Sequence, residues 1–448
     1  MIAENSAPAP ATGVAIVGCG YVFDHYMTTA GAHPELDIRG VFDIDGARSA
    51  AVARHYGLEV YPGLDAIIAD PSVDLVLNLT SIEAHVEVTR ALLEGGKHVY
   101  SEKPLTTDLE SARALFDLAA ARGLVLASAS CNFFSDSVQT MWKAVRDGAI
   151  GRPLLVYAEF DDNPIYLMKP EGWRSRSGAP WPYLHEYEAG CTWEHIGYHL
   201  VWMLAMFGPA RSVTAFSKVT VPHKTDRPLD PADTPDFSVA CVDFHSGVTA
   251  RITCSIAGPA DHRMRIIGDK GELSTDTYRH YQSPVMLERF TQLSLNARKS
   301  RSLRRHPALG GLFGIGGKRL AMLRHWKSHA TMRDHLTSRP SLPKRIVNAL
   351  KRREVGAQDK MLGVAETARA LRAGEPCPIP ADFILHVTEL TLAVQGAGTQ
   401  GAPIVLGTTF APLQPMASTL ASTADFSAGG QGWLAARMEK LIDRLHRH

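Results

Sequence analysis

The sequence has few cysteines, almost no excess charge and no long apolar run. Its six cysteines are scattered, without a Cys-x-x-Cys pair or a metal-finger spacing. Scattered cysteines are typical of reduced, buried thiols, which predicts a cytoplasmic location. No apolar run approaches the length of a membrane span, and the first ten residues lack the basic start and apolar core of a signal peptide. A disulfide-rich secreted domain and a membrane-spanning protein are therefore not expected.

The balance of charges gives the whole molecule no attraction for nucleic acid or for a membrane. The formal net charge is +1, with 45% apolar and 21% charged residues, which is typical of an ordinary globular protein. At about 150 residues per domain, a chain of this length predicts two domains.

The first third of the chain alternates apolar strands with helical stretches. After a start at 1–12 that is expected to be disordered, strands are predicted at 14–17, 38–42, 75–79, 98–101 and 125–129, and helices at 23–32, 47–56, 82–94 and 109–122. This rhythm predicts a doubly wound parallel sheet of the Rossmann type over residues 13–132, and hence an α/β fold.

A glycine-rich turn follows the first expected strand. Gly18-x-Gly20 allows backbone N–H groups and the start of a helix to face a pyrophosphate. Phe23 stands where the dinucleotide-binding fingerprint has its third glycine, so the closest approach of helix to strand is excluded. The alternative reading is that Gly18 and Gly20 only form a tight strand-to-helix turn.

Asp43 ends the next strand and strengthens the cofactor reading. It stands 25 residues after Gly18, near the separation of about 20 expected of a ribose-binding carboxylate. A carboxylate there favours NAD over NADP, while Arg48 offers an anion a partner and keeps NADP possible. The other residues expected to bind the cofactor are Tyr21, Val22, Phe23, Asn78, Thr80, His85, Glu102, Lys103 and Asn132.

Lys103 lies at the end of a further apolar strand, in the triplet Glu102-Lys103-Pro104. Ligands of α/β sheets collect at the carboxyl ends of the strands. An ammonium group there can donate to a carbonyl oxygen or, with its pKa lowered by burial, accept a hydroxyl proton. The alternative is that Lys103 is a surface lysine held by Glu102, without a functional role.

His195 and His199 are spaced i and i+4, which places both imidazoles on one face of a helix predicted at 193–207. Histidine titrates near neutrality and suits proton transfer from a sugar-like hydroxyl. The same spacing suits zinc, but no third ligand has a diagnostic spacing, so no metal is predicted. The alternative is a pair of hydrogen-bonded core histidines.

An aromatic and basic loop precedes these histidines. Trp173, Arg174 and Trp181 belong to it, and aromatic faces beside cations suit sugar rings and phosphates. Together with Lys103, His195 and His199 they are the expected substrate residues. The alternative for the loop is a lid or a dimer contact.

The pattern changes after residue 151 to that of an α+β domain with an open antiparallel sheet, assigned to 133–400. Strands are predicted at 154–160, 212–221, 237–244, 248–256, 264–267 and 272–276, and late helices at 359–373 and 383–395. The tail at 401–448 is expected to be loosely ordered, with a short terminal helix at 433–445.

A basic insertion interrupts the second domain at about 289–357. Between residues 289 and 353 Asp334 is the only acid, and leucines and Trp326 are interleaved with the cations. The insertion is read as a solvated elaboration, an oligomer arm, a capture site for a phosphorylated partner or a contact with an anionic membrane. Nucleic acid is not expected, because no recognisable binding module is present.

These motifs together resemble the glucose–fructose oxidoreductase, inositol dehydrogenase and rhizopine-catabolism (Gfo/Idh/MocA) family. The resemblance rests on Gly18-x-Gly20, Asp43, Gly96-Lys-His-Val-Tyr-Ser-Glu-Lys-Pro-Leu105, Gly148-Ala-Ile-Gly151 and the helix that carries His199. It implies an N-terminal Rossmann domain and a C-terminal open sheet through which homo-oligomers, dimers or tetramers, form.

The resemblance also implies roles for single residues. Lys103 matches the catalytic lysine, and His199 matches the histidine of an Asp-x-x-x-His motif that accepts the proton. The aspartate of that motif is His195 in this chain, which removes a negative charge from the neighbourhood of His199.

The predicted function is an NAD(P)-dependent oxidoreductase that transfers a hydride between nicotinamide and a hydroxyl or ketone carbon of a sugar, cyclitol or nucleotide sugar. Two alternatives stay open. One is a redox-neutral, NAD-dependent glycosidase or lyase, and the other is a non-catalytic NAD-binding regulatory or scaffold protein.

Overall fold

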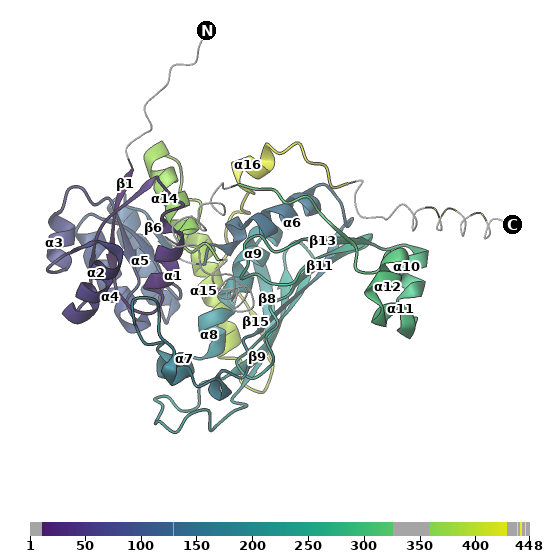
Figure 1. Cartoon of the computed structure of the whole chain (residues 1–448), viewed down its shortest axis with the longest axis horizontal. Coiled ribbons are helices and arrows are strands. Elements are labelled where there is room, and N and C mark those ends of the chain that lie inside the picture. The colour runs from purple at the N-terminus through teal and green to yellow at the C-terminus, as the bar shows by residue number, and fades with distance from the viewer. Residues whose placement is uncertain are drawn as a thin grey trace, which may run out of the picture.

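The structure is a computed structural model and describes residues 11–128, 130–325 and 358–427, with three single positions beyond them (437, 440 and 444). Two bodies lie side by side in Figure 1, a Rossmann domain at the purple end of the chain and a second domain built on a large sheet. Among the described residues no helix has the length and apolar character needed to cross a bilayer. The expected terminal helix at 433–445 and most of the disordered start lie outside the described ranges.

The N-terminal sheet is parallel and confirms the predicted fold. Its strand order is β3-β2-β1-β4-β5-β6, the order of dinucleotide-binding Rossmann sheets. The strands are β1 (Thr12–Val17), β2 (Leu36–Phe42), β3 (Glu59–Val60), β4 (Leu75–Asn78), β5 (His98–Ser101) and β6 (Leu126–Ser128). The helices are α1 (Phe23–Ala30), α2 (Gly46–Tyr56), α3 (Leu64–Ala69), α4 (Ile82–Glu94) and α5 (Leu109–Ala121).

Strands β1 and β4 are buried along their whole length, because helices cover both faces of the sheet. They are neighbours in the sheet although β2 and β3 separate them in sequence. The strand order therefore reverses between β1 and β4, and a crevice for ligands opens at their carboxyl ends. Gly18 and the residues that follow Asn78 lie at this point.

The second domain is built on a nine-stranded sheet with the order β14-β13-β12-β11-β7-β10-β9-β8-β15. Its strands are β7 (Pro153–Asp161), β8 (Ala210–Lys218), β9 (Phe237–Phe244), β10 (Thr249–Ser255), β11 (Met264–Gly268), β12 (Gly271–Thr275), β13 (Met286–Arg289), β14 (Lys318–Arg319) and β15 (Pro403–Val405). The predicted antiparallel character holds for every pair but one, since β7 and β10 run parallel.

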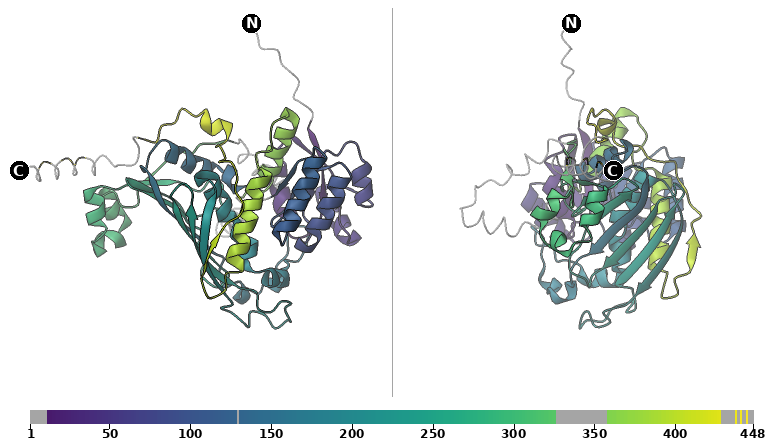
Figure 2. Two further views of the ribbon diagram at one scale, coloured as in Figure 1. Left: turned by 180° about the vertical axis from the view of Figure 1, so that it is seen from behind. Right: turned by 90° about the vertical axis from the view of Figure 1, so that its right-hand side faces the viewer.

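Among the described residues, helices cover one face of this sheet and leave the other bare, as the right panel of Figure 2 shows. The covering helices include α6 (Asp136–Arg146), α9 (Gly197–Phe207) and α15 (Ala381–Gln395). Strand β9 accordingly alternates between buried residues that face the helices and more exposed ones that face away.

The single helix predicted at 193–207 is two helices. Helix α8 (Cys191–His195) starts earlier, and α9 follows after a turn at Ile196. Gly197 is a poor helix former and stands at the break between the two helices. The apolar sequence pattern continues across this break, although the helix does not.

The C-terminal part of the chain returns to the Rossmann domain. Helix α14 (Leu362–Ala373) begins beside strand β5, where a Cβ added to Gly363 would lie 2.8 Å from Cβ of Cys131 and would also meet the Tyr100 hydroxyl. Buried His33, just after α1, contacts the Asp359 carboxylate at 3.0 Å. This part of the chain is therefore packed tightly against the cofactor domain.

Two further segments differ from expectation. Residues 401–427 were expected to be loosely ordered, but β15 pairs with β8, α16 (Ala417–Leu420) follows, and Phe410 and Phe426 are buried. Part of the basic insertion forms a lobe of three short helices, α10 (Gln292–Ala297), α11 (Arg301–Arg305) and α12 (Pro307–Leu312). Residues 326–357 of the insertion lie outside the described residues.

Candidate active site

The turn after β1 has the geometry that a dinucleotide requires. Gly18 adopts a φ of +96°, and a Cβ there would lie 2.5 Å from the carbonyl carbon of Leu79, so only glycine fits. A Cβ added to Gly20 would meet nothing within 4 Å. The turn is thus closed on the side of β4 and open beside the start of α1, where a pyrophosphate binds in this fold. These residues fit an NAD-type cofactor.

Asp43 and Arg48 line the same turn. The Asp43 carboxylate accepts hydrogen bonds from the backbone N–H groups of Cys19 (2.6 Å) and Asp45 (2.8 Å). Each carboxylate oxygen retains a further acceptor position for a ribose hydroxyl. The Arg48 guanidinium donates to the Cys19 carbonyl and to Ser177, so protein atoms already occupy four of its five N–H donors.

Ser177 belongs to the loop between η3 (Pro170–Gly172) and α7 (Tyr183–Ala189) of the second domain. Its backbone N–H and its hydroxyl donate to the Asp24 carboxylate at 3.0 and 2.8 Å, and its hydroxyl accepts from Arg48 at 3.1 Å. The loop is thereby fastened across the glycine-rich turn. Sequence reasoning did not single out Ser177 or Asp24, because neither belongs to the fingerprint.

Several expected cofactor residues instead order the ends of the strands. The Asn78 amide bonds to the His85 carbonyl and the Thr89 hydroxyl, and its oxygen accepts from Thr80. His85 is buried between the carbonyl groups of Pro104 (2.8 Å) and Thr80 (3.1 Å). Burial holds the pKa of His85 below its ordinary value. These side chains position the turn around Lys103 and do not present free groups.

The remaining expected cofactor residues have mixed surroundings. The Phe23 side chain is fully buried against the Tyr56 ring, so only its backbone borders the turn. The Tyr21 and His25 rings are tilted to each other with centroids 5.4 Å apart, and Val22 is the residue that precedes α1. The Asn132 amide donates to the Tyr198 carbonyl at 2.6 Å.

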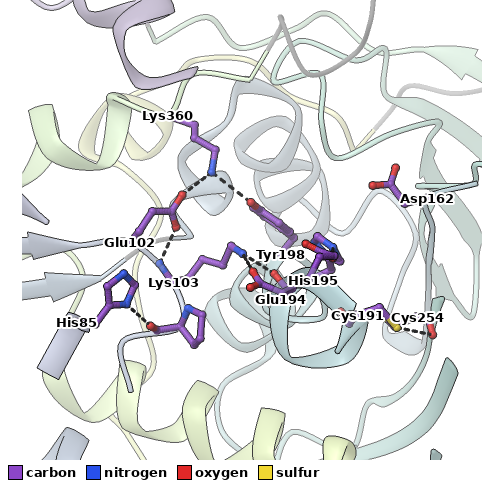
Figure 3. A network of polar contacts seen from close by, with 12 residues as sticks. His85, Glu102, Lys103, Asp162, Cys191, Glu194, His195, Tyr198, Cys254 and Lys360 are labelled. Carbon is purple, nitrogen blue, oxygen red and sulfur yellow. Dashed lines mark hydrogen bonds and ion pairs between the residues drawn. The ribbon is translucent and has the colours of Figure 1, made fainter. Parts of the chain in front are cut away.

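Lys103 lies at the carboxyl end of β5 and points toward the second domain (Figure 3). Its ammonium group contacts the Glu194 carboxylate at 2.6 Å and the Glu194 carbonyl at 2.7 Å. Burial alone would lower the pKa of Lys103, but the Glu194 carboxylate outweighs burial and raises this pKa above its ordinary value. Lys103 is therefore an ammonium group at neutral pH.

A second ion pair stands beside the first. Lys360 contacts the Glu102 carboxylate at 2.6 Å and the Tyr198 hydroxyl at 3.2 Å, and Glu102 also accepts the Lys103 backbone N–H (Figure 3). Burial would raise the pKa of Glu102, but Lys360 and Lys103 lower it to about 2. The Tyr198 ring lies 5.5 Å from the Lys103 ammonium group.

His195 joins this group of charges from the end of α8. Its Nε2 contacts the Glu186 carboxylate, and its ring stacks on Phe160 of β7 with centroids 4.5 Å apart. Its Nδ1 is buried and meets no partner within the described part of the chain. A buried nitrogen of this kind can bond to a bound ligand.

His199 lies deeper in the same interface. It is fully buried, its Nε2 contacts the Glu159 carbonyl at 2.8 Å, and its Nδ1 accepts from the Trp202 indole at 3.0 Å. Burial lowers the pKa of His199 to about 3. The two imidazoles come from different helices, and both contact β7. In this geometry His199 is a hydrogen-bonded core histidine.

The expected substrate loop pairs its own aromatic rings. Trp173 and Trp181 pack with centroids 4.8 Å apart, across a bridge between Arg174 and Pro180. The Arg174 guanidinium donates to the carbonyls of Glu171 and Trp173. Within the described part of the chain, no hydrogen bond or ring contact joins these three side chains to Lys103, and the loop reaches the Rossmann domain through Ser177 instead.

Three charged or polar site residues escaped sequence reasoning. Lys360 follows the basic insertion and carries no motif, and Tyr198 was overlooked between two histidines. Arg279 lies after β12, pairs with Asp162 at 2.8 Å and holds the pKa of that buried carboxyl below its ordinary range. Glu194 and Glu186 had a signal in the sequence, since both are acids close to His195.

The site can hold a carbonyl or hydroxyl oxygen against an ammonium group beside the cofactor turn. Lys103 supplies the charge, Glu194 keeps it protonated, and Tyr198 and His195 lie next to this pair. This is the equipment of an acid–base step on an oxygen substituent.

Comparisons with known proteins agree with this geometry. The model of the oxidoreductase family with an NAD-binding Rossmann fold (GFO/IDH/MocA) matches residues 12–130, and the model of the GFO/IDH/MocA C-terminal domain matches residues 138–274. The first range covers β1 to β6 and the second runs from α6 to β12.

Two curated relatives carry the name dTDP-3,4-didehydro-2,6-dideoxy-alpha-D-glucose 3-reductase. The protein from Streptomyces antibioticus is 34% identical over 141 residues, 32% of this chain and 42% of the relative. The protein from Streptomyces violaceoruber is 28% identical over 290 residues, 64% of this chain and 78% of the relative. The chain thus spans less than half of the first relative.

Solved structures share the fold. The WlbA dehydrogenase from Bordetella pertussis, in complex with NADH and UDP-GlcNAcA, superposes with a TM-score of 0.60 at 16% identity. The match covers 89% of this chain and 99% of that one. Two family models over more than half of the chain, the Rossmann strand order and the open sheet lead to one conclusion: the chain belongs to the Gfo/Idh/MocA family of oxidoreductases.

Proposed function

We propose that the protein is an NAD(P)-dependent oxidoreductase that acts on a hydroxyl or ketone carbon of a carbohydrate-like substrate, with nucleotide sugars among the candidates. The observation that carries this proposal is the Lys103 ammonium group, held at 2.6 Å from Glu194 at the carboxyl end of β5. Relatives named as a nucleotide-sugar reductase, and a neighbour bound to NADH and a nucleotide sugar, support the substrate class.

Gly18, Gly20 and Asp43 would hold the cofactor, whose nicotinamide supplies or accepts the hydride. NAD is favoured over NADP, because Asp43 repels a 2′-phosphate and four of the five N–H donors of Arg48 are bonded to Cys19 and Ser177. To gain more than one hydrogen bond from Arg48, a 2′-phosphate would have to displace these contacts.

Lys103 acts as the charged hydrogen-bond donor in this proposal. Since its raised pKa keeps it an ammonium group, it donates a hydrogen bond to the oxygen of a ketone and stabilises the negative charge that develops there. Glu194 holds the ammonium in place, and Lys360 balances the Glu102 carboxylate behind it. In the oxidative direction the same groups act in reverse. His195 is assigned to substrate contact and proton transfer, and His199 to the core.

A homo-oligomer in the cytoplasm is the second part of the proposal. The bare face of the nine-stranded sheet offers a broad surface (Figure 2), where Tyr157 lies between the guanidinium groups of Arg251 and Arg265. The six unpaired cysteines fit a reducing compartment. Sedimentation velocity of the full chain measures the oligomeric state, and a monomer at micromolar concentration would contradict the assignment.

The decisive experiment follows absorbance at 340 nm with NAD(H) and NADP(H) against free sugars, cyclitols, nucleotide sugars and their keto forms, with product analysis on the same samples. Lys103→Met is expected to lower turnover by about 100-fold or more, the usual worth of a positioned acid–base group, and to leave NAD affinity within a few-fold. Lys143→Met, a lysine paired with Asp147 on α6, is the matched control.

Unchanged turnover in Lys103→Met would overturn the mechanism. Product without a change in NADH would replace it by redox-neutral chemistry. NAD binding without product from any substrate would favour a regulatory role.

A further inference from the structure

The three short helices of the basic insertion form a projection that the proposed function does not use. We define the basic lobe as residues 290–325, which hold α10, α11, α12 and β14. Figure 1 shows the three helices at the end of the nine-stranded sheet that lies farthest from the Rossmann domain. The two family models end at residues 130 and 274, before the basic lobe. The basic lobe therefore lies outside both matched ranges.

The basic lobe has cations and no acids. No Asp or Glu occurs between residues 290 and 325. Arg298 is paired with Glu288 of β13 at 2.6 Å. Seven further cations are exposed, and among the described residues none of them forms an ion pair: Lys299, Arg301, Arg304, Arg305, Lys318, Arg319 and Arg324.

Apolar side chains are exposed on the same lobe. Leu295, Leu309 and Leu312 are 45, 47 and 46% exposed, one on α10 and two on α12. An exposed leucine does not gain the favourable free energy of apolar burial until another surface covers it. The helices α11 and α12 contact each other, so the cations of α11 and the leucines of α12 belong to one small surface unit.

We propose that the basic lobe docks the protein on a bilayer leaflet that carries anionic headgroups. Unpaired lysines and arginines attract such a surface, and each contributes about a fivefold gain in binding near it. Leucines between the cations enter the boundary between headgroups and acyl chains. The cations are thus complementary to the anionic headgroups, and the leucines are complementary to the acyl chains beneath them.

A nucleic acid or another polyanion fits less well. Such a ligand uses the cations but gains nothing from exposed leucines, and readers of single strands present aromatic side chains for base stacking. Among the exposed residues of the described lobe there is no aromatic ring other than His306. The exposed leucines therefore favour a membrane over a nucleic acid as the partner. For the same reason, the test changes the leucines separately from the cations.

The test is flotation of the full-length protein with vesicles of phosphatidylcholine alone or of phosphatidylcholine with 30 mol% phosphatidylglycerol, at low and at physiological salt. We expect binding to the anionic vesicles only, weakened by salt. Arg301→Glu/Arg304→Glu/Arg305→Glu is expected to lower the partition coefficient by about 100-fold or more. The matched control, Arg54→Glu/Arg90→Glu/Arg113→Glu, reverses three exposed charges of the Rossmann helices and should keep binding within a few-fold.

The leucines are tested separately. Leu309→Ser/Leu312→Ser is expected to lower partitioning by about tenfold at unchanged charge, since each change removes apolar area from the bilayer. Leu167→Ser/Leu420→Ser removes two leucines elsewhere that are at least as exposed, and this variant should bind as the parent does. Equal NAD binding by all variants shows that each one is folded.

Three outcomes would overturn the proposal. One is no binding to anionic vesicles at low salt. Another is full binding after Leu309→Ser/Leu312→Ser, which would show that charge attraction alone holds the protein on the vesicles. The third is a single-stranded RNA oligonucleotide that binds at physiological salt and displaces the protein from the vesicles.

Discussion

At the scale of single residues, the two histidines of α8 and α9 show that spacing alone does not assign a role. Both contact β7, yet among the described residues His195 keeps a buried nitrogen without a partner, while both nitrogens of His199 are bonded. Burial lowers the pKa of His199 to about 3. We therefore propose that His195, beside Lys103, takes part in proton transfer and that His199 does not.

Substitution by glutamine separates the two roles. His199→Gln retains one donor for the Glu159 carbonyl and one acceptor for the Trp202 indole, so we expect kcat within about threefold of the parent and a lower Tm. His195→Gln is expected to lower kcat by at least about tenfold with little change in Tm. Steady-state kinetics and thermal unfolding of both variants measure this. The reverse pattern would return the catalytic role to His199.

The residues of the cofactor turn could be predicted because backbone geometry demands them. Gly18 must be glycine where β4 passes close by, and Asp43 ends a strand at a fixed distance. Lys360 could not be predicted, since nothing in its local sequence indicates that it lies beside Glu102. Phe23 was predicted at the cofactor but lies in the core, because a side chain at that position turns inward.

At the scale of elements, the loop that carries Ser177 links the two domains over the cofactor turn. Four hydrogen bonds fasten it to Asp24 and Arg48. Burial would raise the pKa of Asp24, but its hydrogen bonds outweigh burial and leave this pKa below its ordinary value. We expect the loop to retain a cofactor that is bound in this turn.

Ser177→Ala removes the two bonds of the hydroxyl and leaves the backbone bond to Asp24. A hydrogen bond to a charged partner contributes about 1.5–3 kcal/mol, so we expect NADH to dissociate about tenfold faster. Stopped-flow fluorescence of NADH release measures the rate. Ser302→Ala, on the exposed surface of α11, is the control and should release NADH at the parent rate. An unchanged rate in Ser177→Ala would show that the loop does not retain the cofactor.

The elements themselves were predicted to different degrees for physical reasons. Strands β5 and β9 and helix α4 have the predicted bounds, because strong apolar patterns with clear stops define them. Strands β3, β14 and β15 have two or three residues each, too few for any periodicity. Their pairing is set by neighbours far away in sequence. The break at Ile196 was hidden for the opposite reason, since the apolar pattern continues across it.

At the scale of the whole molecule, the return of the chain after residue 357 ties the domains together. His33 contacts Asp359 at 3.0 Å and Glu35 at 3.2 Å. Burial would lower the pKa of His33, but Asp359 and then Glu35 outweigh it and raise this pKa to about 9. The next residue along the chain, Lys360, is the one that reaches Glu102.

This clamp predicts a loss of stability at alkaline pH. The pKa of His33 is about 6.5 in the unfolded chain and about 9 in the folded protein, so the folded state binds the proton more tightly. The stabilisation is complete below pH 6.5 and is lost as the pH rises through 9. A difference of this size corresponds to about 3 kcal/mol at most.

Thermal unfolding at several pH values between 6 and 10 measures this loss. The parent protein is expected to lose more stability over this range than His33→Gln, which has no proton to release at that position. Parallel curves for the two proteins would show that His33 does not clamp the chain.

The ion pairs around Lys103 have a consequence for how the chain can be divided. Glu102, Glu194 and Lys360 come from three distant stretches of sequence and meet only when the two ends of the fold are assembled. A cut between residues 326 and 357 would leave the cofactor turn on one fragment and Lys360 on the other. The Glu102 carboxylate and the Lys360 ammonium group would then lie on different fragments. Recovery of catalysis after the two fragments are mixed would therefore report reassembly of the molecule.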